Sequence, residues 1–437
     1  MKFQKTILAL SLSAISVHSH SAAFQLNETS ASGLGRAFAG DAVIADDAAV
    51  LARNPAAMAL FKAKSLSVAA TYVDPGVDVK GAGAPDLIDS INGGNFDLSK
   101  LDEDGVVPGA VIPGFYFINP INDKFAFGFG MNSNFGLSTD YPDSYPAGSI
   151  AGGTELTTVN FNASGSYRLN EQLSFGLGLN VVYGDAVLTR HAGDTGAALA
   201  ASQGRVLPAN TELIKMEGDD ISFGWNVGAV YEVNADHRFG LTYRSEVAVD
   251  FEGDYTAVGS PTVAGNLAID MPWGAEFSGF HQLNKQWAVH YSVMYTNWES
   301  FEKMEAFTSG PDPVFAKDEN YESTYRFALG TTYTHSDSLT LRAGIAHDES
   351  AAVDAFRSIS IPDSDRLWYS AGATYKISDS DSIDFGFAYV DGDKVTLHEE
   401  DAVLADVPPA LVGADKDWHF ESEGNAILLS VQYNKSF

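Results

Sequence analysis

Apolar and polar residues alternate with a period of two along most of the chain. From Trp287 to Tyr295 the odd positions are bulky and apolar, whereas the even positions are mostly small or polar. The stretch from Phe125 to Asn132 repeats this pattern, with Phe or Met at every odd position and Ala, Gly or Asn between them. Because the side chains of a β-strand point alternately to two faces, we predict strands with one face suited to lipid and one suited to an interior.

The alternation recurs in about fourteen segments, and an even number of strands can close an antiparallel barrel. We expect these strands to begin near Ser65, Ala110, Lys124, Leu156, Leu173, Ile221, Arg238, Leu267, Gln286, Tyr325, Leu339, Leu367, Ile383 and Ala426. Tight turns, such as residues 119–123 and 169–172, alternate with long connections. The long connections predicted are residues 74–109, 134–155, 191–220, 302–321 and 391–423. Short turns on one side and long loops on the other are typical of an outer-membrane barrel; a soluble protein with several sheets is the alternative.

The N-terminus has the layout of a secretory signal peptide. Lys2 and Lys5 precede an apolar run from Ile7 to Val17, and small residues follow as far as Ala23. We predict a cleaved signal peptide over residues 1–22, with cleavage after Ala22 or Ala23 that leaves Phe24 at or next to the mature N-terminus. A buried first helix is the alternative, but the run is too short to span a bilayer, and no later stretch reaches about 18 apolar residues.

The last strand carries an apolar stripe that reaches the end of the chain. Leu429, Val431, Tyr433 and Phe437 share one face, and Lys435 interrupts them. Outer-membrane strands commonly end on an aromatic residue, and a lysine near the membrane surface can extend its ammonium group toward water.

The residues between the signal peptide and the first strand, 23–64, do not alternate. They are rich in Gly and Ala and contain the consecutive acids Asp46 and Asp47. We expect this compact segment to fit inside a barrel. The alternative is a disordered leader, but a disordered leader would not need small residues for packing. We expect Asn54-Pro55-Ala56 to end the segment, because Pro55 lacks an amide donor and disfavours a helical Asn54.

Composition excludes several classes of function. The formal charge is −31, which argues against a protein that binds nucleic acid by neutralising phosphates. The chain has no Cys, and its ten His residues are scattered without a Gly-x-Ser-x-Gly motif, so we expect neither an enzyme nor a metal site or cofactor.

Several stretches of the chain are distinctive, namely residues 24–28, 32–37, 44–48, 54–56, 133–137, 243–246, 328–333, 358–363 and 420–424. Together they resemble the FadL/TodX family of outer-membrane transporters, more closely its fatty-acid branch than its hydrocarbon branch. The resemblance covers essentially the whole mature chain. It implies a 14-stranded antiparallel transmembrane β-barrel over residues 65–437, plugged by an N-terminal hatch over residues 23–64 that includes Asp46, Asp47 and Asn54-Pro55-Ala56.

The resemblance also implies site residues. The ligand would lie in an apolar pocket that Phe24 contacts, with Arg190 and Lys317 binding a carboxylate head group. It would leave sideways beside a kinked third strand, through a lateral gate formed by Asn132, Ser133, Asn134, Phe135 and Gly136. From the alternation of the wall strands we further expect Asp46 and Asp47 to pair with inward-facing arginines such as Arg244 or Arg326.

The expected function is passive uptake of long-chain fatty acids or similar lipophiles across the outer membrane of a Gram-negative cell. A hydrocarbon channel of the same family is the first alternative, and a general diffusion porin is the second. The expected partners are the ligand, outer-membrane lipid and lipopolysaccharide, with no nucleic acid, and the protein is expected to be a monomer. The short loop over residues 252–265 leaves the shape of the first capture site open.

Overall fold

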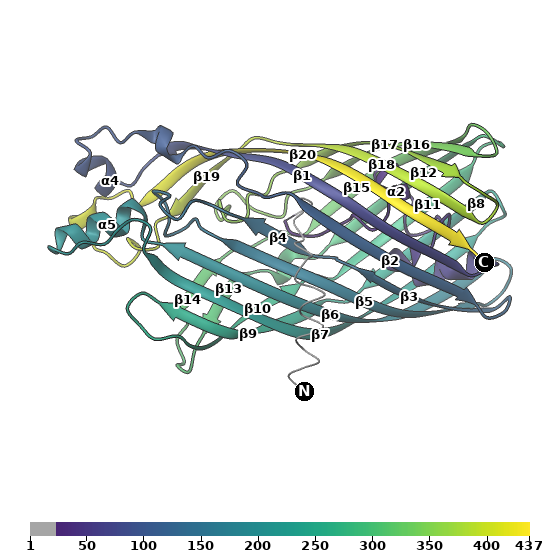
Figure 1. The fold of residues 1–437 in the computed structure, drawn as a ribbon, viewed down its shortest axis with the longest axis horizontal. Helices are drawn as coiled ribbons and strands as arrows, with labels where there is room; N and C mark the ends of the chain where they lie inside the picture. Colours follow the sequence, from purple (N-terminus) through teal and green to yellow (C-terminus); the bar gives the residue numbers. More distant parts are fainter. Residues whose placement is uncertain (1–22) are drawn as a thin grey trace.

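The computed structural model describes residues 23–437 (Figure 1). The predicted signal peptide lies outside the described residues. Within residues 23–437, no helix combines the length and the apolarity that a membrane-spanning helix needs.

The strands close into one antiparallel barrel. Six strands are each interrupted once, so that fourteen strands appear as twenty segments of a single sheet in the described chain. The first strand pairs with the last from Ser65 opposite Ser436 to Gly83 opposite His419, and this pairing closes the barrel. The prediction of a 14-stranded barrel is therefore confirmed.

The bounds of the strands follow the chain in order. The uninterrupted strands are β1 Ser65–Gly83, β2 Ala110–Pro120, β5 Thr154–Arg168, β6 Leu173–His191, β7 Glu212–Glu232, β16 Leu339–Asp348, β17 Arg366–Lys376 and β20 Asp417–Ser436. The interrupted strands are β3 Phe125–Asn132 with β4 Gly136–Thr139, β8 His237–Arg244 with β9 Val247–Ala257, β10 Val263–Met271 with β11 Gly274–Gln282, β12 Trp287–Thr296 with β13 Lys303–Phe307, β14 Phe315–Asp318 with β15 Thr324–Thr334, and β18 Asp381–Gly392 with β19 Val395–Glu400.

The helices are short. Inside the barrel are α2 Ala31–Leu34, α3 Val50–Arg53 and the 3₁₀ helix η1 Pro55–Leu60. In the connections are α4 Asp86–Ile91, η2 Leu98–Leu101, α5 Gly193–Ser202 and α6 Pro409–Val412, and η3 Trp298–Ser300 lies in the interruption between β12 and β13. In Figure 1, α4 and α5 mark the end with long loops, and the C-terminus marks the end with tight turns, which is the periplasmic end in outer-membrane barrels.

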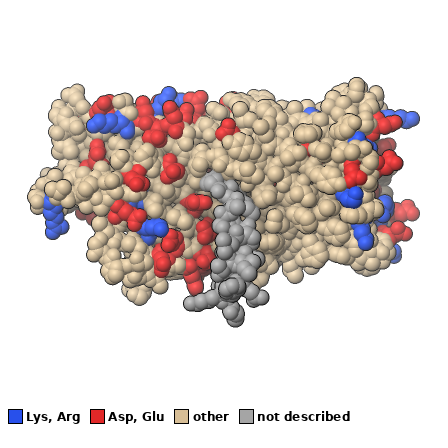
Figure 2. Space-filling model, in the orientation of Figure 1, with Lys and Arg blue, Asp and Glu red and all other residues tan. Residues whose placement is uncertain are grey.

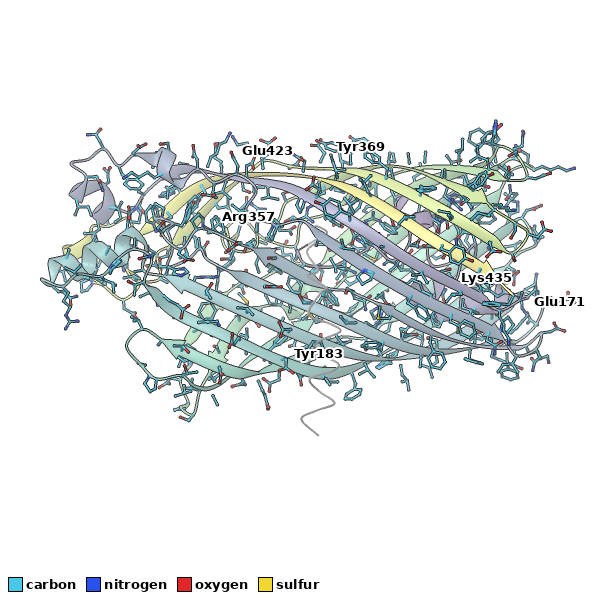
Figure 3. All side chains as sticks on the ribbon, in the orientation of Figure 1. Glu171, Tyr183, Arg357, Tyr369, Glu423 and Lys435 are labelled. Atoms are coloured by element: carbon cyan, nitrogen blue, oxygen red, sulfur yellow. The ribbon has the colours of Figure 1, made fainter. Side chains whose placement is uncertain are left out.

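Alternating side chains give the barrel an apolar outer surface. On β18, Phe385, Phe387 and Tyr389 are exposed, whereas Asp384 and Ala388 between and beside them are buried. Figure 2 shows an uncharged belt between the charged end with tight turns and the acid-rich half that carries the long loops. On β20, the predicted stripe is also outward-facing, and Lys435 forms an ion pair with Asp381 at 3.1 Å near the periplasmic end (Figure 3).

Several predicted loops are wrong, because the strands continue beyond the apolar belt. Strand β7 begins at Glu212 and β20 at Asp417, nine residues before the apolar alternation starts at Ile221 and Ala426. The connections over residues 134–155, 302–321 and 391–423 likewise contain short strands. Backbone pairing needs no apolar side chains, so a strand that projects into water leaves no two-residue hydrophobic pattern in the sequence.

The N-terminal segment, called the hatch below, fits the interior because facing wall residues are glycines. A methyl group added to Gly228 of β7 would lie 1.9 Å from the Asn54 side-chain oxygen, and one added to Gly176 of β6 would lie 2.3 Å from the Ala56 nitrogen. Most hatch residues are buried. Backbone-to-wall contact of this kind depends on the missing Cβ atoms on the lumen side of the strands.

Replacing Gly228 with Val is expected to loosen the hatch while the barrel stays folded. The new side chain overlaps Asn54, and such overpacking costs about 1–3 kcal/mol. Limited proteolysis of the detergent-solubilised protein should cleave the variant's hatch faster than that of the wild type. Gly165→Val is the matched control, because a Cβ there meets no atom within 4 Å. Equal cleavage of both variants would contradict the steric argument.

Candidate functional site

A partly open apolar cavity lies in the half of the barrel nearer the long loops. About 700 Å³ of space lies between its walls, part of it continuous with solvent. The side chains that form it come from the N-terminus and from opposite walls, and they include Phe24, Leu137, Leu188, Met216, Phe251, Ile269, Phe301, Met304 and Ile361. The apolar lining of this cavity suits a long apolar ligand.

Phe24 forms part of the cavity wall and is the centre of an aromatic cluster. It is only 1% exposed. Its ring makes edge contacts with Trp298, Phe301 and Phe135, at centroid distances of 4.7, 5.2 and 6.1 Å. The first residues of the hatch are thus packed between the cavity and the third strand of the barrel.

Arg190 lies beside this cavity at the end of β6. Its Nη1 donates hydrogen bonds to the Thr154 hydroxyl at 3.2 Å and to the Thr189 carbonyl at 2.8 Å, and Thr154 itself lines the cavity. Its Nη2 donates to the Ser360 hydroxyl at 2.9 Å. Burial lowers the pKa of Arg190 to about 10, so the guanidinium stays charged at neutral pH.

Lys317 on β14 contacts the segment from Ser358 to Ser360, which is called the serine turn below. Its ammonium group donates to the Ser358 hydroxyl at 2.5 Å and to the Glu399 carboxylate. Ser358 and Ser360 are two residues apart, so the structure brings Lys317 and Arg190 to one short segment. The two cations differ, because Lys317 has a carboxylate partner, whereas in residues 23–437 Arg190 forms no ion pair.

The loop that carries this serine turn is held by Arg357. The Nε and Nη2 atoms of Arg357 donate to the carbonyls of Asp363 and Ala352 at 3.0 and 3.1 Å. Figure 3 places Arg357 toward the end with long loops, away from Glu171 and Lys435. The turn is therefore anchored within its own loop, independently of Arg190 and Lys317.

Glu319 is a site residue that the sequence reasoning missed. Its side chain is 1% exposed, and neither carboxylate oxygen has a hydrogen-bond partner among the residues described. Burial raises its pKa to about 7, although Lys317 and Arg190 oppose this shift. Acidic residues in an outer loop normally face water, so the sequence around Glu319 offers no signal of burial.

The third strand bends inward at the predicted lateral gate. Strand β3 pairs with β5 as far as Asn132 opposite Asn160, and β4 resumes at Gly136 opposite Thr157. Three residues, 133–135, therefore face only two on β5, which is a bulge. The Thr158 hydroxyl at the bulge donates to the Phe135 carbonyl at 2.6 Å, and the Ser133 hydroxyl donates to the Thr158 carbonyl at 2.5 Å.

The hatch pairs with the bent strand in place of β2. The Leu26 amide donates to the Asn134 carbonyl at 2.7 Å, and the Gly136 amide donates to the Phe24 carbonyl at 2.9 Å. The ladder between β2 and β3 ends at Phe115 opposite Met131. Among the described residues, no strand pairs with that edge of β2 from Ala110 to Gly114, so the wall has a gap beside the bend.

Asp46 has a wall arginine as its partner, but the residue is Arg342. Arg342 Nη2 lies 2.9 Å from Asp46 Oδ2, and the hatch residue Arg36 binds the same oxygen at 3.2 Å. Asp47 instead accepts hydrogen bonds from the Ser32 hydroxyl at 2.5 Å and the Ala49 amide at 2.9 Å. The predicted pairing of Asp47 with a wall arginine is therefore wrong.

Arg244 and Arg326 face inward, as predicted, but they do not bind Asp46 or Asp47. Arg244 donates to the Ala52 carbonyl at 2.5 Å. Arg326 donates to the Ala37 carbonyl at 3.2 Å and lies 3.6 Å from Asp348. Arg244 and Arg326 therefore hold the hatch through its backbone carbonyls.

Asn54-Pro55-Ala56 links two helices of the hatch and does not end it. Asn54 is extended and ends α3, as predicted, but its side-chain oxygen also accepts from the Ala56 amide at 2.9 Å and starts η1. Its side-chain nitrogen donates to the carbonyls of Ala42 and Ala229 at 2.7 and 3.2 Å. Pro55 suits the first position of a helix, where no amide donor is needed.

Comparisons with known proteins agree with this architecture. A sequence model of the family described as "Outer membrane protein transport protein (OMPP1/FadL/TodX)" matches residues 12–437. The chain is 40% identical to the long-chain fatty acid transport protein of Escherichia coli (strain K12), over 100% of this chain and 99% of that protein. It is 39% identical to the outer membrane protein P1 of Haemophilus influenzae, with 99% of each chain covered.

Solved structures share the fold. The crystal structure of a Pseudomonas aeruginosa FadL homologue aligns with a TM-score of 0.78 at 24% identity, over 94% of this chain and 99% of that one. The Pseudomonas putida toluene transporter TodX aligns with a TM-score of 0.68 at 17% identity, over 93% and 98%.

The stability of the protein is expected to fall as the pH rises through about 7, because of Glu319. Its pKa is raised from the ordinary 4.5, so its contribution is complete below about pH 4.5 and is lost as the carboxyl ionises near pH 7. A shift of this size corresponds to about 3 kcal/mol. Thermal unfolding of Glu319→Gln in detergent, followed by circular dichroism, should lack this part of the pH dependence.

Glu302→Gln, a change at an exposed acid of the same loop, is the control and should keep the pH dependence of the wild type. Parallel curves for wild type and Glu319→Gln from about pH 5 to about pH 8.5 would show that the buried carboxyl does not titrate in this range.

Proposed function

This chain belongs to the OMPP1/FadL/TodX family of outer-membrane transport proteins, and we propose that it takes up long-chain fatty acids by passive transport. The observation that carries the proposal is the apolar cavity with the buried charge of Arg190 at its border. The cavity suits an acyl chain, and the guanidinium suits its carboxylate. The names of the full-length relatives support the same ligand class.

Burial of the acyl chain supplies the binding energy. Each buried methylene contributes about 0.8 kcal/mol, so enclosing about 16 carbons approaches 12 kcal/mol before ordering costs. A site this favourable would hold its ligand too long for transport. We therefore propose that the hatch shifts between two arrangements, one of which weakens the cavity's hold on the ligand.

The head group would bind at the serine turn. There, a carboxylate can accept hydrogen bonds from Arg190 and can compete with Glu399 for Lys317. A ligand in the cavity would displace Phe24, because this residue lines the cavity. The displacement would reach the gate, because Phe24 is two residues from Leu26, whose amide donates to the Asn134 carbonyl.

Release is proposed to be lateral, through the gap between β2 and the bent third strand. A fatty acid that moves through this gap into the bilayer stays in an apolar surrounding, whereas one released into the periplasm would lose its burial energy. The pairing of the hatch with residues 134–136 supports a gate that moves when the hatch moves.

A hydrocarbon channel is the second candidate function, because the mostly apolar cavity has room for uncharged ligands as well. The buried charge of Arg190 favours an acid. A general porin is disfavoured by the packed hatch, which fills the lumen with buried residues. Contact with lipopolysaccharide and the monomeric state stay predictions.

Exchanging Arg190 and Lys317 together for Ala is expected to weaken binding of oleate but not of an uncharged alkane of similar length. The loss should be about 1–3 kcal/mol, because charge-assisted hydrogen bonds are replaced by water. Tryptophan fluorescence titration of the purified protein measures both affinities. Equal losses for acid and alkane would contradict the head-group role.

A disulfide between hatch and gate tests the lateral route. Gln25 and Phe135 face each other as an antiparallel pair flanked by the two hatch-to-gate hydrogen bonds. Such pairs have Cα atoms about 4.5 Å apart, which suits a disulfide. The double variant Gln25→Cys/Phe135→Cys is expected to bind oleate when oxidised but not to transport it into cells.

Reduction of the same protein is the control and should restore transport, since the chain has no native Cys. Normal oleate transport by the oxidised form, with the cross-link verified by mass, would exclude movement of the hatch away from the gate.

A further inference from the structure

A second cavity, separate from the apolar one, lies between the hatch, the bent strand and the barrel wall. About 540 Å³ of space lies between its walls, part of it continuous with solvent, and the lining includes Asn134 and Phe135 of the bend and Arg53 and Arg244. It shares no lining residue with the first cavity, and the ring pair Phe24 and Phe135 lies between the two.

The position of the second cavity along the strands is closer to the periplasmic end. Arg244 is the eighth residue of β8, counted from the tight turn, whereas Leu188 of the first cavity is the sixteenth residue of β6. A ligand that moves from the first cavity toward the wall gap beside Asn134 and Phe135 would therefore meet the second cavity next.

The charged residues that line this cavity differ in whether they have a partner of opposite charge or a hydrogen-bond partner. Arg53 lies 3.7 Å from Asp41 and donates to the Asn27 carbonyl at 2.9 Å. Glu276, the acid of the lining, accepts hydrogen bonds from the hydroxyls of Ser278 and Ser292 at 2.7 and 2.8 Å. These two charged groups therefore have partners within the protein.

Arg244 differs from both. Its Nη2 donates a hydrogen bond to the Ala52 carbonyl, and within residues 23–437 it forms no ion pair. It is half-buried and lines the cavity. A guanidinium has five N–H donors, so donors remain for a ligand. Placing a positive charge without a counter-ion in a partly enclosed space is costly unless an anion occupies that space for part of the time.

We propose that the second cavity is a transit site for an anionic lipophile, in which Arg244 binds the carboxylate after it leaves the first cavity. The proposal rests on the proposed function and adds a site to it. A carboxylate that crosses the barrel interior without a cation would lose its hydration without compensation. Arg244 removes that barrier, while the acyl chain extends through the gap between β2 and the bent strand.

The test compares Arg244→Met with a matched variant. Arg238 lies on the same strand and, like Arg244, donates to a hatch carbonyl, that of Val43 at 3.1 Å, but it does not line the second cavity. Arg238→Met therefore controls for loosening of the hatch. Arg244→Lys keeps the charge and should retain more transport than Arg244→Met.

Initial uptake of radiolabelled oleate and of uncharged oleyl alcohol is measured in Gram-negative cells whose own fatty acid transporter is deleted. Arg244→Met should lower oleate uptake about tenfold and leave oleyl alcohol uptake and oleate affinity within about twofold of wild type. Arg238→Met should transport both ligands normally.

Other results would contradict the transit site or the proposed function. Unchanged oleate uptake by Arg244→Met, or equal losses for oleate and oleyl alcohol, would overturn the transit site. Equal losses in Arg244→Met and Arg238→Met would overturn it too, because both changes would then act through the hatch. Failure of the wild type to take up oleate would refute the proposed function itself.

Discussion

The requirement that every backbone amide and carbonyl at membrane depth has a partner governs this structure. Lipid offers no hydrogen bonds, so the sheet must close, and the pairing of β1 with β20 closes it. A closed barrel of this size has an interior that must be filled, and the hatch fills it with small residues against wall glycines. The apolar belt outside and the polar interior both follow from this one constraint.

At the bend in the third strand, the backbone groups of the wall are not all paired with a neighbouring strand. There the amides and carbonyls of the bend pair with the first residues of the hatch and not with β2. The same hydrogen bonds thus satisfy the wall and position Phe24 against the apolar cavity. A segment that completes the wall from inside can also open it, which gives the lateral route its physical basis.

The charges divide into those that hold the hatch and those that face ligand space. Asp46 is shared by Arg36 and Arg342, and Arg326 donates to a hatch carbonyl, so these groups fix the hatch. Arg190 and Arg244 lack acidic partners in the described chain, and each lies beside a cavity. Buried or half-buried cations with donors to spare are costly for stability alone, and this cost is consistent with anion binding.

The number of strands, the tight turns and the lipid-facing stripe on β20 were predictable from the residue pattern, because a two-residue pattern is local and each strand carries its own copy. The place of the bend, near Asn132, was implied by the family resemblance. Three features required the folded structure: Asp46 meets Arg342 and not Arg244 or Arg326, Glu319 is buried, and strands β7 and β20 extend nine residues beyond the apolar pattern. These outcomes depend on the packing of segments hundreds of residues apart, on the angle of the hatch and on backbone pairing in water, and none of these leaves a periodic mark on the sequence.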